Sequence, residues 1–89
     1  MKIKKNLILR RIGNEYIIIV PDKDIVDLTE VYTLNKTSAW IWKQFENIDF
    51  SIDDILDLVQ QQYEVERDTA MKDVQTFLNT LIAGKLVID

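Results

Sequence analysis

The sequence contains no cysteine and no histidine. The lack of cysteine excludes disulfides, thiolate nucleophiles and iron–sulfur ligation. The lack of histidine removes the commonest general base and the commonest metal ligand. Any catalysis or metal binding by this chain would have to use carboxylates, hydroxyls, lysines and tyrosines. We therefore expect a chain that binds no metal or cofactor and is not an enzyme by itself.

Glycine and long apolar runs are also scarce. Gly13 and Gly84 are the two glycines of the chain, too few for a glycine-rich loop that cradles phosphates. The longest unbroken aliphatic run, residues 17–20, falls far short of the roughly 18 to 20 residues that span a bilayer. The basic N-terminus is like that of a signal peptide, but Arg10 and Arg11 interrupt the apolar stretch that should follow. We expect a cytoplasmic protein that enters no membrane.

The composition is that of one small domain over residues 1–89. Apolar residues make up 47% and charged residues 29% of the chain, and a chain of this length closes only one modest core. The net charge is −4, but the charges are unevenly placed. A basic group lies near the N-terminus: Lys2, Lys4, Lys5, Arg10 and Arg11. The rest of the chain is an acidic body.

Three runs in the first part of the chain are typical of strands. Residues 7–12 and 15–20 are rich in Ile, Leu, Val and Tyr, and the Gly-Asn pair at 13–14 suits a two-residue hairpin turn. A polar cluster that starts with the single proline ends the second strand at residues 21–24, and a connection follows over residues 25–30. Residues 31–34 are then short enough to be a third strand at a sheet edge.

Beyond the third strand, the spacing of apolar residues changes from two to nearly four. Asn35 is a good N-cap residue, and Trp42 and Phe45 share one face of the helix that we predict for residues 36–47. The stretch Ser-Ile-Asp-Asp at 51–54 resembles a capping box with aspartate in place of glutamate. Apolar residues follow it at helical spacing, which predicts a second helix.

The clearest predicted element is a third helix near the C-terminus. Apolar residues recur at steps of one, three and four from Ala70 to Ile82, and Gly84 is a typical C-terminal stop. Residues 85–88 can close the structure as a short strand. Three strands followed by three helices predict an α+β domain, in which a three-stranded antiparallel sheet buries one face against the helices.

The segment Leu-Asn-Lys-Thr-Ser-Ala-Trp-Ile-Trp at residues 34–42 resembles the Leu-Asn-x-x-Gly-x-x-Ile-Trp signature of the PQQ-biosynthesis protein D (PqqD) family. The acidic opening of the second helix, Phe-Ser-Ile-Asp-Asp-Ile at 50–55, and the Gly-Lys-Leu at 84–86 are also similar to that family. Ser38 stands where the family usually has glycine, and Glu66-Arg67 replace its common Asp-Pro. The resemblance covers nearly the whole chain.

This resemblance implies a winged helix-turn-helix-like peptide-recognition element. Such domains bind the leader of a ribosomally made precursor peptide (a RiPP precursor) and present it to a modifying enzyme, often a radical SAM protein. An unpaired sheet edge beside the third helix offers N–H and C=O groups that an extended peptide can complete. The peptide-binding residues expected on this basis are Val31, Tyr32, Thr33, Leu34, Met71 and Gln75.

The two residues of this set from the third helix are expected to supply side-chain contacts. Four or so backbone hydrogen bonds at roughly 0.5 to 1.5 kcal/mol each cannot reach the ~8 kcal/mol of micromolar affinity. Met71 lies at the margin of the apolar stripe, and its adaptable thioether suits variable peptide side chains. Gln75 follows one turn later. The alternative for Met71 is a place in the core.

Trp40 is a second candidate site. On a helix it shares a side with Lys36 and Lys43, away from Trp42, which we assign to the core. Trp40 could therefore be a hot spot for the modifying enzyme. Large aromatic side chains are usually buried, so the alternative is that the first strand or the start of the chain covers it.

Other functions remain possible from the sequence. Nucleic-acid binding needs clustered Lys and Arg, whereas the second helix carries Asp53, Asp54 and Asp57 without one basic residue. These carboxylates could hold Mg²⁺ or Ca²⁺, but acidic residues at the start of a helix more simply complement its dipole. A homodimer through the third strand would use the same unpaired groups as a peptide.

Overall fold

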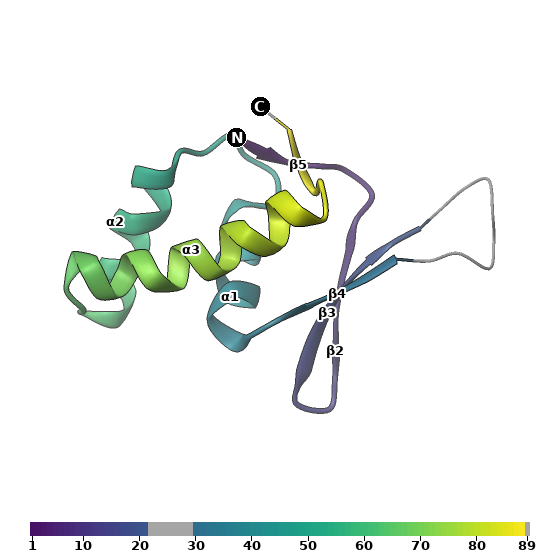
Figure 1. The fold of residues 1–89 in the computed structure, drawn as a ribbon, viewed down its shortest axis with the longest axis horizontal. Coiled ribbons are helices and arrows are strands. Elements are labelled where there is room, and N and C mark those ends of the chain that lie inside the picture. The colour runs from purple at the N-terminus through teal and green to yellow at the C-terminus, as the bar shows by residue number, and fades with distance from the viewer. Residues whose placement is uncertain (22–29, 89) are drawn as a thin grey trace.

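The predicted three-stranded antiparallel sheet is confirmed. The computed structural model describes residues 1–21 and 30–88 (Figure 1). Strand β2 (Ile8–Ile12) pairs with β3 (Glu15–Val20), and β3 pairs with β4 (Glu30–Leu34), both antiparallel. The order β2-β3-β4 places β4 at an edge of the sheet. The connection predicted between β3 and β4 falls largely on residues 22–29, outside the described residues.

A tight turn sets the register of this sheet. Gly13 has a φ of 61°, whereas Asn14 is not among the residues with positive φ, and this pattern is that of a type II′ turn. Ile12 and Glu15, which flank the turn, are Cα partners. In a two-residue hairpin, the two residues that flank the turn form two backbone hydrogen bonds with each other. Along the two strands away from the turn, hydrogen-bonded residue pairs then alternate with residue pairs that form no hydrogen bonds with each other. On β3, the odd-numbered residues therefore bond to β2 and the even-numbered residues bond to β4.

Three helices follow the sheet, as predicted: α1 (Lys36–Phe45), α2 (Ile52–Tyr63) and α3 (Arg67–Ala83). Asn35 caps α1, since its Oδ1 accepts from the Ser38 N–H at 2.7 Å. The capping box of α2 is complete: the Asp54 N–H donates to Ser51 Oγ at 3.1 Å, and the Ser51 N–H donates to Asp54 Oδ2 at 2.9 Å. None of the helices within the described ranges reaches the length and apolarity that a membrane span requires.

A second, two-stranded sheet joins the ends of the chain. Strand β1 (Lys2–Ile3) pairs antiparallel with β5 (Val87–Ile88). The Met1 ammonium donates to the Phe50 carbonyl at 2.7 Å, and the Phe50 N–H donates to the Met1 carbonyl at 2.8 Å. Ile3 is 2% exposed. The start of the chain is thus anchored in the fold, a pairing that the sequence did not predict.

One hydrophobic core lies between the helices and the inner face of the β2-β3-β4 sheet. Figure 1 shows the helices to one side of this sheet. The sheet contributes Ile18 and Leu34, which are 0% and 3% exposed. Trp42 is 1% exposed, which confirms its assignment to the core. Other large buried residues come from all three helices: Ile41, Phe45, Ile55, Leu56, Val59, Val74, Phe77, Leu78 and Leu81.

Candidate functional site

The outer edge of β4 offers unpaired backbone groups. Within the described residues, no strand pairs with this side of β4. Ile18 is the partner of Tyr32, and even-numbered residues of β3 bond to β4. The backbone of Tyr32 therefore faces β3, and the backbones of Val31 and Thr33 direct their N–H and C=O groups to the open edge. Two residues thus supply four groups to an added strand.

The four β4 residues predicted to bind a peptide have different environments. Val31 is 54% exposed and Thr33 is exposed, in keeping with their place at the open edge. Leu34 is 3% exposed and belongs to the core, so its side chain supports the edge from within. Tyr32 is half-buried and faces the helices, because its partner Ile18 does so. The Tyr32 ring therefore lies on the inner side of β4, and the Tyr32 backbone pairs with β3.

The Tyr32 ring lies against the residue that follows α3. A Cβ atom on Gly84 would lie 2.9 Å from both Cε1 and Cζ of Tyr32 and 3.0 Å from Cγ of Leu86. Such distances are too short for carbon atoms in contact. Glycine at this position thus lets the Tyr32 ring approach the end of α3. This close approach connects the inner side of β4 to α3.

This contact leads to a test. Gly84→Ala is expected to destabilise the domain by roughly 1 to 3 kcal/mol, as overpacking usually does. Thermal or urea unfolding followed by circular dichroism measures the change. In a Tyr32→Ala background the added methyl loses both contacts with the Tyr32 ring and keeps the one with Leu86 Cγ, so the second substitution is expected to cost less. Equal costs in the two backgrounds would show that Tyr32 is not the cause.

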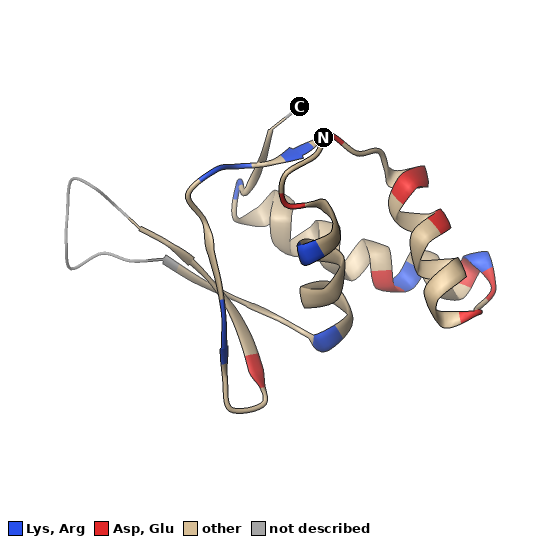
Figure 2. Cartoon of the chain, turned by 180° about the vertical axis from the view of Figure 1, so that it is seen from behind, with Lys and Arg blue, Asp and Glu red and all other residues tan. Residues whose placement is uncertain are grey.

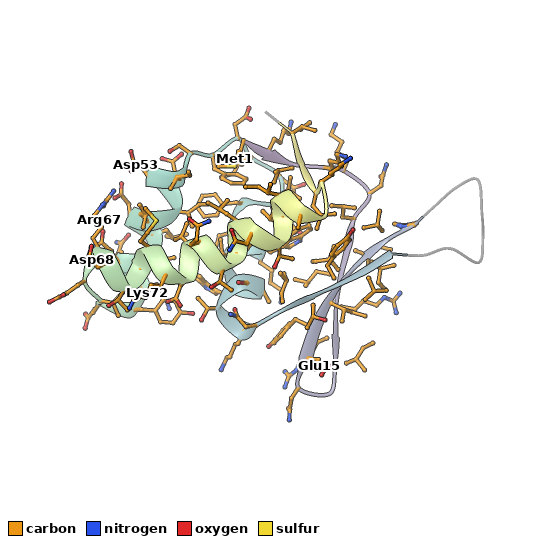
Figure 3. The ribbon with its side chains drawn as sticks, viewed as in Figure 1. Met1, Glu15, Asp53, Arg67, Asp68 and Lys72 are labelled. Carbon is orange, nitrogen blue, oxygen red and sulfur yellow. The ribbon has the colours of Figure 1, made fainter. Side chains whose placement is uncertain are left out.

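One flank of α3 faces α2 and the small sheet. Arg67, in the first turn of α3, pairs with Asp53 of α2 at 3.0 Å (Figure 3). Ile82, in the last turn, lines a pocket with Met1 and Val87. Residues at steps of three and four lie on one side of a helix. The flank that includes Arg67 and Ile82 is therefore turned away from β4.

The other flank of α3 faces β4. Because Gly84 contacts the Tyr32 ring, the residues three to four positions apart that precede Gly84 lie on this side. They are Thr80, Phe77 and Asp73. Thr80 and Asp73 are half-buried and Phe77 is 0% exposed. This flank of α3 thus consists of one aromatic ring buried in the core and two short, half-buried polar side chains.

By helical phase, Met71 and Gln75 do not share the flank of α3 that leads to Gly84. Met71 lies one turn after Arg67, on the flank that faces α2. It is 41% exposed, so it is not the core residue considered as an alternative. The Gln75 Nε2 donates to Asn79 Oδ1 at 2.7 Å on the exposed side of α3. Their role in peptide binding stays a prediction that the helical phase does not support. Both flanks border the buried stripe, so the sequence pattern could not distinguish them.

Trp40, on α1, lies near the end of α2 and strand β3 of the hairpin. Its ring meets the ring of Tyr63 edge-on, with centroids 5.6 Å apart and an interplanar angle of 79°. It also lines a cavity of about 160 Å³ together with Tyr16, Lys36, Ala39 and Lys43. Trp40 is half-buried. Tyr63 contacts one part of the Trp40 ring, and the ring also lines a cavity whose lining includes two lysines.

The acidic residues of α2 have structural partners. Arg67 pairs with Asp53 at 3.0 Å and with Asp57 at 3.3 Å, and Asp54 completes the capping box. Over residues 1–21 and 30–88, no cluster of carboxylates has the arrangement of a metal site. Figure 2 shows acidic residues along α2, and lysine or arginine on α1 and the N-terminal strands. The carboxylates of α2 thus serve helix capping and packing against α3.

Comparisons with known proteins agree with this architecture. Among solved structures, TbiB1 in complex with the TbiA(β) leader peptide is similar, with a TM-score of 0.68 and 23% identity over 100% of both chains. At this identity the likeness establishes the fold. No curated protein matches the sequence. The family model described as Coenzyme PQQ synthesis protein D (PqqD) matches residues 15–87, which include β3, β4 and the three helices. The chain therefore belongs to the PqqD family.

Proposed function

We propose that this protein captures the leader of a ribosomally made precursor peptide by strand addition to β4. It presents the peptide to a modifying enzyme and does not catalyse the modification itself. The observation that carries this proposal is the open edge, where Val31 and Thr33 offer four backbone groups. Membership of the PqqD family and the likeness to TbiB1, which was solved with a leader peptide, support it.

The geometry also predicts how the leader contributes affinity. Four backbone hydrogen bonds supply roughly 2 to 6 kcal/mol, so micromolar affinity, about 8 kcal/mol, requires apolar contacts as well. Side chains of an added strand alternate between the two faces of the sheet. Those on the inner face are expected to lie beside the half-buried ring of Tyr32 and the half-buried Thr80 of α3. The leader is therefore an extended segment with apolar residues at alternate positions.

The modifying enzyme is expected to bind at a different place. The cavity at Trp40 lies between α1 and β3, whereas the leader adds to β4, so both partners can be bound at the same time. The radical SAM class is the enzyme class that the family suggests. Because precursor peptides are made on ribosomes, we place this encounter in the cytoplasm.

Hydrogen exchange of individual amides tests strand addition directly. In the protein alone, the Val31 and Thr33 amides face solvent and are expected to exchange fast, and the Tyr32 amide is expected to be protected by β3. A saturating synthetic leader, made from a precursor sequence encoded beside this gene, is expected to protect Val31 and Thr33 selectively. A peptide of the same composition in scrambled order is the control.

The same samples yield shift changes in NMR titrations. We expect saturable changes at Val31, Thr33 and Leu34, and at Asp73 and Thr80 on α3. Chemical-shift changes centred on Met71 and Gln75 would instead indicate that the peptide binds on the side of α3 that faces α2. No change with any neighbouring precursor, at concentrations far above micromolar, would reject the proposed function.

A further inference from the structure

The sheet has an outer face that a leader on the β4 edge leaves uncovered. Ile18 is buried against the helices, and side chains alternate along each strand. The residues of the opposite side follow from the register. This outer face comprises Ile8, Arg10, Ile12, Glu15, Ile17, Ile19, Val31 and Thr33. Figure 1 shows the helices on the other side of the sheet.

The outer face is unusually apolar for a surface in water. Ile8, Ile12 and Val31 are 41%, 61% and 54% exposed. Ile17 and Ile19 are half-buried, yet they are not among the residues that pack against the core. An antiparallel sheet with one solvated face usually carries polar residues there. A contiguous exposed apolar patch is typical of an interaction surface.

The two charged residues of this face suggest its partner. Arg10 and Glu15 lie on adjacent strands, offset by two positions, because Arg10 pairs with Ile17 and Glu15 pairs with Ile12. In the described part of the chain, neither side chain forms an ion pair or a hydrogen bond. Figure 3 marks Glu15 near the tip of the hairpin, away from the helices. One cation and one anion in an apolar surface make that surface complementary to itself.

We propose that the outer face packs against the outer face of a second copy, and that the two copies form a two-fold symmetric dimer. In such an interface the same residues meet from both sides. Arg10 of each copy then pairs with Glu15 of the other, and the aliphatic side chains of the two sheets pack between them, as in face-to-face sheet packing. This dimer uses the face of the sheet, so both β4 edges stay open and each dimer offers two leader sites.

Mass in solution tests the dimer. Light scattering after size exclusion, over a range of protein concentrations, is expected to give twice the 10.5 kDa of one chain. Ile17→Lys, near the centre of the face, and Ile12→Lys, at its margin, are expected to give monomers with unchanged circular dichroism. Ile82→Lys is the control, because Ile82 is 61% exposed on α3, and it is expected to stay dimeric. A wild-type chain that is monomeric at every concentration would overturn the proposal.

Charge reversal tests the pairing of Arg10 with Glu15. Arg10→Glu and Glu15→Arg are each expected to weaken dimerisation by roughly tenfold or more, and the double variant is expected to restore it. Failure of the double variant to recover would overturn the symmetric arrangement. The Ile17→Lys monomer is expected to bind the leader with the affinity of the wild type. The mass in solution therefore tests the dimer, and leader binding separately tests the proposed function. If Ile17→Lys abolished binding of a modifying enzyme and left the mass in solution unchanged, the outer face would be the binding surface for that enzyme, and the dimer proposal would be overturned.

Discussion

Thr33→Pro is expected to weaken leader binding at least tenfold while the domain stays folded. The Thr33 N–H faces the open edge, so proline at this position removes no hydrogen bond of the sheet, and proline is tolerated on edge strands in this orientation. The leader loses one hydrogen bond, and the proline ring occupies the space that its backbone must enter. Tenfold corresponds to ~1.4 kcal/mol. Calorimetric titration with the leader peptide measures the loss, and urea unfolding measures the stability.

Two control variants separate backbone from side-chain effects at this edge. Thr33→Ala keeps the N–H and is expected to bind the leader nearly as the wild type does. Tyr32→Pro removes an N–H that faces β3, so it is expected to lower stability and binding together. Wild-type affinity in a folded Thr33→Pro variant would argue against strand addition at β4.

Trp42→Ala is expected to have the largest effect on stability, a loss of about 3 to 5 kcal/mol. The Trp42 side chain is 1% exposed, so its removal leaves a cavity that the surrounding helices can close only in part. Small domains have a total stability of roughly 5 to 15 kcal/mol, and the variant is therefore expected to be partly unfolded at 37 °C. Urea unfolding followed by circular dichroism measures this loss.

Trp40→Ala is the matched comparison for Trp42→Ala. Trp40 is half-buried and its main aromatic contact is the edge-on ring of Tyr63. We expect a loss of only about 1 to 2 kcal/mol. Equal losses for the two variants would mean that Trp40 is as much a core residue as Trp42. A folded Trp40→Ala variant can then be tested for binding of the modifying enzyme.

Local signals predicted most elements of this fold because they act over a few residues. The turn at Gly13 and Asn14, the cap at Asn35 and the capping box at Ser51 are all present in the structure. The predicted end of the first helix was two residues late, since α1 ends at Phe45. Strand β5 lies within the short strand predicted for residues 85–88. Strand β1 has two residues, too few to show a period, and its pairing with β5 joins opposite ends of the sequence.

The sequence by itself determined the order of elements, the hairpin, the helix caps and the resemblance that indicated a peptide-binding edge. Hydrogen-bond ladders, caps and φ preferences depend on neighbouring residues, so these features can be predicted from short segments. Only the tertiary structure decided that Val31 and Thr33 carry the open backbone groups, and that the end of α3 at Gly84 lies against the Tyr32 ring. Those features depend on strand register and on which flank of α3 meets Tyr32, and both are set by contacts between residues far apart in the chain.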